Sequence, residues 1–214
     1  MNQPLAQQAY GKIIEMILSG TLMPGDALQE AKLGDTLDMS RTPVREAIKR
    51  IEAEGLAVQD GRFLKVRTLT AAEVEEIFFL RRVLESHCAR QATSVAVSVL
   101  DELDARVRHL LQHGPGEEDE QRRVDDDLHR TFALSTRNEM MVSTIADLRR
   151  RTCMFDHSNL PHRFLKSCEE HLEMLDALRA GDGDRAGLLM AEHINHARDA
   201  ILERLALSLE RTGE

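Results

Sequence analysis

The first 70 residues alternate short stretches of helical apolar spacing with turn residues. Apolar side chains recur at helical spacing over residues 5–19 and 29–37, and again over a stretch that opens with Thr42 and Pro43. We expect Thr42 to cap the first amides of this third helix, and Pro43, which has no N–H to leave unpaired, to take its first position. Gly55 is expected to end it. The pattern predicts three short helices.

Two short apolar stretches, residues 56–58 and 63–66, come after the third helix. Between them stands Asp60-Gly61, a pair that readily adopts the positive φ of a tight hairpin turn. We therefore expect a small β-hairpin. A short helix, a tight turn, a second helix and a hairpin are together the order of a winged helix-turn-helix.

From Thr70 onward the pattern is helical throughout, and Thr70 stands at capping-box spacing from Glu73. Turn residues divide this part into six expected helices, near residues 71–93, 97–113, 117–136, 139–155, 162–180 and 184–210. The predicted fold is therefore mainly α. It combines an N-terminal winged helix-turn-helix over residues 1–70 with a C-terminal all-α six-helix bundle over residues 71–214.

Composition excludes several classes of protein. Of the 214 residues, 42% are hydrophobic, which is enough for a sizeable core. The chain has no 18-residue apolar run, and its first residues lack the features of a signal peptide, so we expect a cytoplasmic protein with no membrane partner. Cys88, Cys153 and Cys168 stand at no metal-knuckle spacing, which argues against a disulfide scaffold or a zinc finger. Aromatic residues make up only 3% of the chain, which argues against base-stacking platforms.

The charge is unevenly distributed along the chain. Residues 1–70 carry nine basic and nine acidic residues, so the whole net charge of −9 lies on residues 71–214. Residues 41–67 contain seven basic residues and only four acidic ones. A small basic footprint on an acidic protein is typical of a duplex-reading module attached to a separate sensing or oligomerising body.

The basic residues gather on the expected third helix. Arg41, Thr42 and Arg45 lie near its N-terminal end, the part of a reading helix that enters the major groove. An arginine matches guanine O6 and N7 with two donors, whereas Lys49, or Thr42 through its hydroxyl, suits phosphate better. In the alternative interpretation, the arginines form a solvated helix face and pair with glutamates four residues away; these are Arg41, Arg45 and Arg50, with Glu46 or Glu54.

Residues 19–66 (SGTLMPGDALQEAKLGDTLDMSRTPVREAIKRIEAEGLAVQDGRFLKV) resemble the winged-helix domain of GntR-family bacterial transcription regulators. The match extends over about residues 10–67. The resemblance implies DNA contacts from the reading helix and the wing, at Arg41, Thr42, Pro43, Arg45, Gly61 and Arg62. One departure concerns Ala31, where several members carry an arginine that contacts DNA. That contact is either absent here or made by Lys32.

Three histidines and one aspartate form a possible metal site in the helical part. Asp125 and His129 are four residues apart and so share one helix face, while His171 and His193 lie beside apolar residues on two further helices. A single inward histidine is more often a hydrogen-bonded core residue, but three with a carboxylate indicate a common partner. This donor set suits a divalent metal ion, with Zn²⁺ or Ni²⁺ foremost. Asp126 is the alternative carboxylate; the other histidines are expected at the surface or behind the ligands.

Residues 71–210 resemble the all-helical FCD effector domain of the FadR subfamily, in its smaller VanR-like branch. The motifs that carry the resemblance are Arg81-Arg82-Val83-Leu84-Glu85, Asp125-Asp126-Asp127-Leu128-His129, Asn138, Glu170-His171-Leu172, Ala177-Leu178, Gly181-Asp182 and Met190-Ala191-Glu192-His193-Ile194. The resemblance implies that an effector carboxylate completes the coordination of the ion, and hence that a small organic acid is the effector. Arg81 would pair either with this carboxylate or with Glu85. Asn138 would either cap a helix or contact the effector.

These observations lead to one main hypothesis and two alternatives. The main hypothesis is a transcription regulator that binds a double-stranded DNA operator as a homodimer and responds to a small organic acid bound at a metal-containing pocket. In this hypothesis residues 71–214 bind the effector and dimerise. The first alternative is a regulator in which the ion itself is the signal. The second is a metal-dependent hydrolase, but the chain has neither an HExxH nor a G-x-S-x-G motif, and we expect no enzyme activity.

Overall fold

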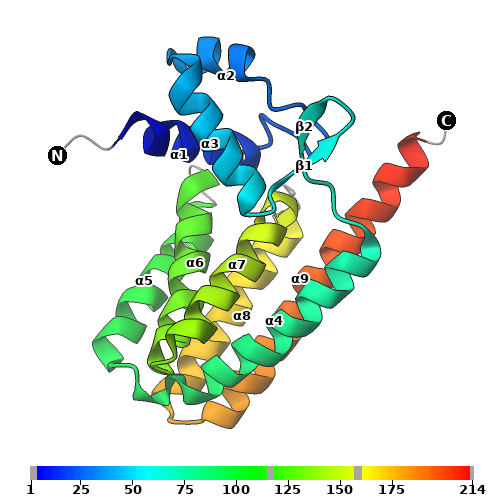
Figure 1. The fold of residues 1–214 in the computed structure, drawn as a ribbon. Helices are drawn as coiled ribbons and strands as arrows, with labels where there is room; N and C mark the ends of the chain where they lie inside the picture. Colours follow the sequence, from blue (N-terminus) through cyan, green and yellow to red (C-terminus); the bar gives the residue numbers. More distant parts are fainter. Residues whose placement is uncertain (1–3, 115–117, 157–160, 213–214) are drawn as a thin grey trace. The chain divides into compact units, whose positions relative to one another are not determined.

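The computed structural model describes residues 4–114, 118–156 and 161–212 (Figure 1). The main division between two compact units falls between Leu69 and Thr70, and each unit is described by itself. The first is a small helical unit with a β-hairpin, and the second is built of helices alone. The predicted fold class, a winged helix-turn-helix followed by an all-α bundle of six helices, is confirmed.

The first unit contains three helices and a two-stranded sheet. The elements are α1 (Leu5–Leu18), α2 (Glu30–Leu37), α3 (Arg41–Ala53), β1 (Ala57–Asp60) and β2 (Phe63–Val66). Helices α1 and α2 both pack against α3. Their apolar stripes meet in a core that excludes water and includes Ala9, Ile13, Leu33, Val44, Ile48 and Ile51.

Helix α3 begins earlier than the sequence predicts. Its first residue is Arg41, so Pro43 occupies the third helical position and not the first. The N-cap is Ser40 and not Thr42 as predicted, and the Ser40 side chain forms no capping bond. Asp38 ends α2 in a left-handed conformation with φ of 52°, and only Met39 and the extended Ser40 separate it from the first residue of α3. Pro43 is tolerated because first-turn amides have no acceptor within the helix.

The hairpin closes as expected, with Asp60 paired to Phe63 and Gly61 at φ of 60°. A third extended segment, residues 25–28, lies along β2 and was not predicted. The Gly25 amide donates to the Val66 carbonyl, and the Leu28 amide to the Leu64 carbonyl, each at 2.8 Å. These bonds satisfy the outer side of β2, which would otherwise be an open sheet edge.

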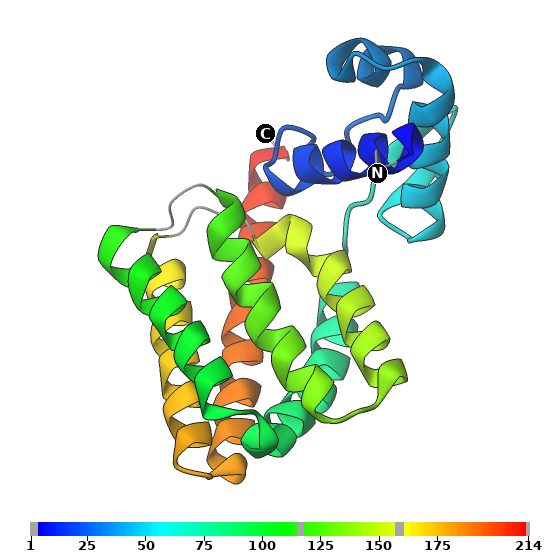
Figure 2. The same cartoon turned by 90° about the vertical axis from the view of Figure 1, so that its left-hand side faces the viewer.

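The second unit consists of six α-helices and one short 3₁₀ turn within the described residues. They are α4 (Ala71–Gln91), the 3₁₀ turn η1 (Ala92–Ser94), α5 (Val97–His113), α6 (Glu118–Ser135), α7 (Glu139–Asp156), α8 (Pro161–Arg179) and α9 (Gly183–Thr212). The predicted capping box starts α4, with the Glu73 amide donating to Thr70 Oγ1 and the Thr70 amide to Glu73 Oε2. Helix α8 packs against α5 and α9, and α6 packs against α4 and α5 (Figure 2).

Helices α4 and α9 form the most extensive helix pair, and glycines bring them together. A Cβ atom on Gly183 would lie 2.3 Å from the Arg90 carbonyl oxygen, and one on Gly187 would lie 3.0 Å from that of Ser86. Any other residue at Gly183 would force the two backbones apart, whereas one at Gly187 would require only a small adjustment. No helix in the described ranges is long and apolar enough to cross a lipid bilayer.

Candidate metal centre and DNA-reading surface

One face of α3 is basic and open to solvent. Arg41, Arg45 and Lys49 succeed one another at intervals of four residues, and all three are exposed together with Thr42. Within the described part of the chain, these three side chains form no ion pair or hydrogen bond. The opposite face of the helix carries its buried residues, Val44, Ala47, Ile48 and Ile51.

Arg50 behaves differently and supports the alternative interpretation for one arginine. Its guanidinium carbon lies 3.9 Å from the centre of the Tyr10 ring, and Nε donates to Glu54 at 3.0 Å. Nη1 donates to Gln7 at 2.7 Å. Arg50 therefore joins α3 to α1 and takes no part in the exposed basic face.

The other residues expected to contact DNA differ in their exposure to solvent. Gly61 and Arg62 are exposed at the tip of the hairpin, where the Arg62 guanidinium lies over the Phe63 ring. Pro43 is buried within the first unit. Lys65 lies further along the wing and forms an ion pair with Asp60 at 2.7 Å.

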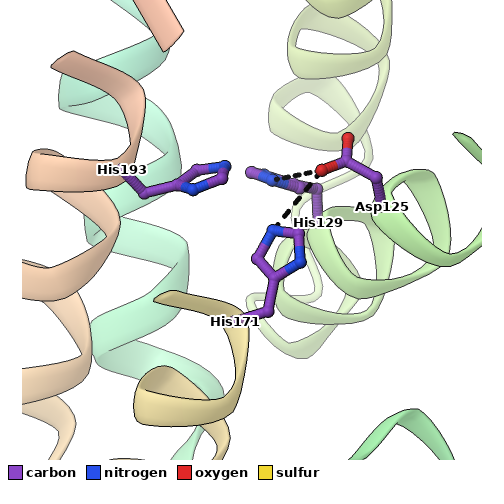
Figure 3. Close-up of side chains that lie close together, drawn as sticks. All are labelled: Asp125, His129, His171 and His193. Atoms are coloured by element: carbon purple, nitrogen blue, oxygen red, sulfur yellow. Dashed lines mark ion pairs between the residues drawn. The ribbon is translucent and has the colours of Figure 1, made fainter. Parts of the chain in front are cut away.

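The four expected metal ligands come together in the second unit. Asp125 and His129 project from α6, His171 from α8 and His193 from α9 (Figure 3). One potential ligand atom from each residue lies within 4.8 Å of the others. All three histidines are buried. The four side chains that the sequence groups by spacing and motif therefore lie around one point.

One oxygen of Asp125 faces two imidazole nitrogens in this cluster. Asp125 Oδ1 lies 3.4 Å from His171 Nε2 and 3.8 Å from His129 Nε2. Both Nε2 atoms are buried and lack a hydrogen-bond partner among the described residues. A buried polar atom without a partner is costly, and the four residues around this point could hold a metal ion.

The protonation states suit metal binding. Burial lowers the pKa of His171 to about 3 and that of His193 to about 4, and it lowers the pKa of His129 as well. Burial alone would raise the pKa of Asp125, but Arg149 and the histidines outweigh it and hold this pKa well below its ordinary value. The cluster therefore offers three neutral imidazoles and one carboxylate at neutral pH, which are the ligand forms.

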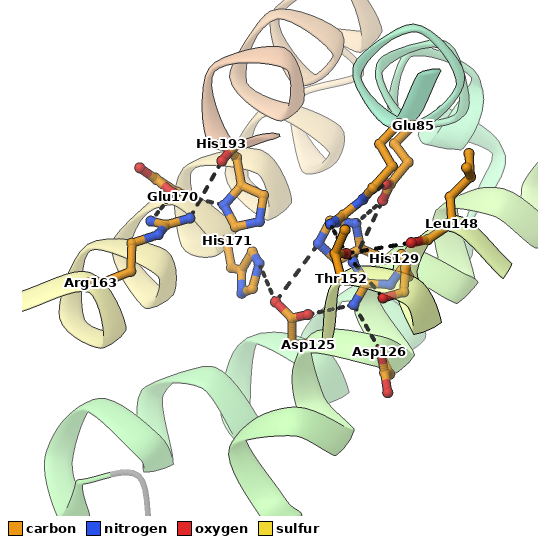
Figure 4. A network of polar contacts seen from close by, with 12 residues as sticks. Glu85, Asp125, Asp126, His129, Leu148, Thr152, Arg163, Glu170, His171 and His193 are labelled. Carbon is orange, nitrogen blue, oxygen red and sulfur yellow. Dashed lines mark hydrogen bonds and ion pairs between the residues drawn. The ribbon is translucent and has the colours of Figure 1, made fainter. Parts of the chain in front are cut away.

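Two further carboxylates lie behind the histidines (Figure 4). Glu85 on α4 accepts a hydrogen bond from His129 Nδ1, and Glu170 on α8 accepts one from His193 Nδ1 at 2.7 Å. Burial would raise the pKa of Glu85, yet Arg81, His129 and Arg149 hold it below its ordinary value. The pKa of Glu170 falls to about 2, because its bonds to His193 and Arg163 outweigh its burial.

Arg149 on α7 holds the carboxylate ligand in place. Its Nη2 atom donates to Asp125 Oδ2 at 2.5 Å and to Asp126 at 2.8 Å. Because Oδ2 is bound by arginine, Oδ1 is left to face the histidines. Asp126 is exposed and pairs with Arg149, so the structure places Asp125, and not the alternative Asp126, in the cluster.

The two residues expected to bind the effector have other partners. Arg81 is buried, and its Nε atom donates to Glu85 at 2.8 Å while Nη1 donates to Thr152 at 3.0 Å. Asn138 caps α7, since its side-chain oxygen accepts from the Met141 amide at 3.1 Å. The cap and the Arg81–Glu85 pair were the alternative interpretations of these residues.

The described histidines outside the cluster lie at the surface or behind it, as expected. His196 is half-exposed and donates from Nδ1 to Glu170 at 2.7 Å, behind the cluster. His87, His109 and His113 are exposed. His157 lies outside the described residues, and the side chain of His162 is not described. No site role was predicted for Glu170, Arg149 and Arg163, since charged residues on amphipathic helices usually face solvent, nor for the uncharged Thr152.

Comparison with known proteins gives matches to both units. Residues 5–62 match the bacterial regulatory proteins of the gntR family, and residues 76–196 match the FCD domain. The HTH-type transcriptional repressor RspR of Escherichia coli (strain K12) is 27% identical over 207 residues, covering 93% of this chain and 90% of that protein. E. coli McbR/YncC has a TM-score of 0.78 at 21% identity, covering 96% of this chain and 100% of that one. A GntR regulator from Rhodococcus sp. RHA1 has a TM-score of 0.76 at 24% identity, covering 92% and 97%.

Proposed function

The chain belongs to the GntR family of bacterial transcription regulators and carries an FCD domain, and we propose that a small organic acid regulates it through a metal ion held by Asp125, His129, His171 and His193. It is a DNA-binding regulator and not an enzyme, because the family and the matched relatives are regulators. The hydrolase alternative is therefore dropped. The ligand, the ion and the assembly form the proposal.

One observation carries the metal part of the proposal. His129 Nδ1 lies against Glu85, and because an ionised carboxylate can only accept, Nδ1 would carry the proton and leave a lone pair on Nε2, which faces Asp125 Oδ1. Two acceptors facing each other in a buried site repel unless a cation lies between them. Three imidazoles and one carboxylate suit Zn²⁺ or Ni²⁺, whose neutral nitrogen ligands they would supply. Water or a carboxylate would occupy the positions these four residues leave open, and the bound ion would polarise that group.

The effector proposal rests on this donor set and on the family. A small organic acid would bind the ion through its carboxylate, and the contacts expected of Arg81 and Asn138 stay predictions. Thermal-shift screening of small organic acids, with and without added Zn²⁺, tests this part because a ligand stabilises the folded state by mass action. We expect stabilisation that requires the metal. If an acid stabilised the chelator-treated protein as much as the Zn²⁺-loaded protein, the proposal that the acid binds through the ion would be contradicted.

Metal analysis of the purified protein tests the site itself. Replacing His129, His171 or His193 with alanine should each reduce bound metal after dialysis, because each removes a ligand. His87→Ala is the matched control, since this histidine is exposed on α4 and does not belong to the cluster. Unchanged metal content in all three ligand variants would overturn the site.

The exchange of the ion distinguishes the second candidate, a regulator that senses the metal itself. Asp125 is the one ligand that is partly exposed, which gives the ion a route to solvent. An ion retained through dialysis supports the effector-anchoring role. An ion that exchanges readily, and whose removal alone switches operator affinity, supports sensing.

The DNA part of the proposal assigns base contacts to Arg41 and Arg45, and a phosphate contact to Lys49 or to the hydroxyl of Thr42. Support comes from the exposed face that these residues form on α3. Gly61 and Arg62 would contact the duplex from the wing. The burial of Pro43 suggests that it shapes the start of α3, which then presents its neighbours to the groove.

A homodimer on a palindromic operator completes the proposal. Two-fold symmetric proteins that present a reading helix match two half-sites one helical turn apart. Sedimentation velocity of the purified protein checks the assembly, with a mass of two chains expected at micromolar concentration. A monomer both free and on DNA would contradict it.

A further inference from the structure

Glu85 and Glu170 lie directly behind two of the proposed ligands without facing the centre of the cluster. Glu85 accepts from His129 Nδ1, and Glu170 accepts from His193 Nδ1. The two carboxylates come from different helices, α4 and α8, and both are buried. We propose that Glu85 and Glu170 are positioning residues, which fix His129 and His193 as Nδ1–H tautomers and so turn each Nε2 lone pair toward the ion. The inference rests on the proposed metal site.

Each carboxylate is itself held in place by basic groups. Glu85 Oε1 accepts from Arg81 Nε at 2.8 Å, which leaves Oε2 for His129. Glu170 Oε2 also accepts from Arg163 Nη1 at 2.9 Å, and its Oε1 accepts from His196 at 2.7 Å. Both carboxylates are therefore ionised, oriented and unable to donate a proton. A group that can only accept requires the imidazole nitrogen in front of it to carry the hydrogen.

A purely structural role would need the arginine bonds alone. Asp104 on α5 provides that case, because it is buried and accepts from Arg108 and Arg179 but contacts no histidine within the described residues. Glu85 and Glu170 differ from Asp104 in the imidazole that each also binds. Asp104→Asn is thus a matched control that removes a buried, arginine-paired carboxylate without touching a ligand.

The position of Glu85 has a consequence for regulation. Helix α4 supplies none of the four ligands, yet Glu85 connects it to His129, and Arg81 connects it to Thr152 on α7. Because Glu85 orients His129, the position of α4 would affect the affinity of the site for the ion. A ligand that shifts α4 would therefore alter the affinity of the site for the ion.

The tautomers can be read in the metal-free protein by ¹⁵N NMR of labelled imidazoles. We expect the Nδ1–H form for both His129 and His193. In Glu85→Gln, Arg81 retains the amide oxygen and the NH₂ group faces Nδ1, so the bond reverses and the proton of His129 moves to Nε2. His193 should stay unchanged there, and Glu170→Gln should alter His193 alone. Wild-type tautomers of the Nε2–H form, or no change in either variant, would overturn the proposal.

Metal affinity gives the second measurement, by competition of Zn²⁺ with a chelator. Glu85→Gln and Glu170→Gln should each weaken binding about 10- to 100-fold, whereas Asp104→Asn should stay within about twofold of wild type. If one variant fails to fold, the other still decides. Wild-type affinity in both glutamine variants, with loss in His129→Ala, would overturn the positioning role alone. Wild-type affinity in the histidine variants would overturn the metal site, while the tautomer result would stand independently.

Discussion

At the scale of single residues, the two carboxylate oxygens of Asp125 have different partners. One oxygen is bound by Arg149, and the other faces His171 and His129. The sequence predicts Asp125 and His129 on one helix face because they are four residues apart. It does not predict Arg149, since nothing in a sequence indicates which arginine of another helix will turn inward to meet a carboxylate.

The contacts of Glu85 were likewise only partly predictable from the sequence. Its pairing with Arg81 is foreseeable from i,i+4 spacing, but the bond of its second oxygen to His129 depends on how α4 packs against α6. Apolar residues surround α4 on most sides, among them Phe78, Phe79, Leu80 and Val83. The pattern therefore did not reveal which face of this helix is buried.

Arg45 gives a prediction at the same scale. Arg45→Ala should weaken binding to a specific operator by about 1–3 kcal/mol, because it removes a proposed base contact from the exposed face of α3. Fluorescence anisotropy with DNA from upstream of the gene measures the change. Lys12→Ala removes one exposed positive charge from α1 instead of α3 and serves as the control. An equal loss in both variants would show that Arg45 acts through charge alone.

The buried histidines predict a pH dependence of the metal-free protein. In the unfolded chain a histidine takes up a proton near its ordinary pKa of 6.5, whereas the folded values are about 3 for His171 and about 4 for His193. The unfolded state thus binds more protons between these limits, and stability, complete above pH 6.5, is lost as pH falls. Each histidine contributes a slope of up to about 1.4 kcal/mol per pH unit.

Urea unfolding of the chelator-treated protein, at pH values between about 5 and 8, measures this slope. A variant with His171→Gln and His193→Gln should show a flatter profile, because glutamine does not titrate. If wild type and variant lose stability in parallel as the pH falls, these histidines are not the cause.

At the scale of elements, the turn residues were the most informative signals. Gly55, Gly61 and the Thr70 capping box stand where the sequence predicts elements to end or begin. The start of α3 differs, and Asp38 before it takes a left-handed conformation without being glycine. The strand-like pairing of residues 25–28 was missed because Pro24-Gly25 indicates a turn but not the conformation of the residues after it.

The contact between α4 and α9 gives a prediction for a pair of elements. Gly183→Ala should destabilise the bundle by about 1–3 kcal/mol, because the new methyl group would lie against the Arg90 carbonyl. Gly187→Ala should cost less, since its nearest contact, at 3.0 Å, is looser. Gly11→Ala on α1, where the methyl group meets nothing within 4 Å, is the control and should be stabilising or neutral. Thermal unfolding ranks the three; a Gly183→Ala protein as stable as wild type would contradict the close packing.

At the scale of the whole molecule, the distribution of charge agrees with the proposed division of the chain into a DNA-binding part and an effector-binding part. The entire net charge of −9 lies on residues 71–214, and the exposed basic face lies on α3 of the first unit. The sequence predicts this division because composition and punctuation both change near Thr70. The pattern does not predict the identity of the effector or the operator sequence, since both depend on detailed complementarity between a surface and its partner.

The central claim is that an organic acid acts on operator binding through the ion at Asp125 and the three histidines. Fluorescence anisotropy of the upstream DNA tests it, with an acid identified by thermal shift added to Zn²⁺-loaded protein, chelator-treated protein and the His171→Ala variant. The account predicts that the acid changes operator affinity at least about fivefold in the loaded protein and leaves the other two unchanged. The same change in all three would contradict it.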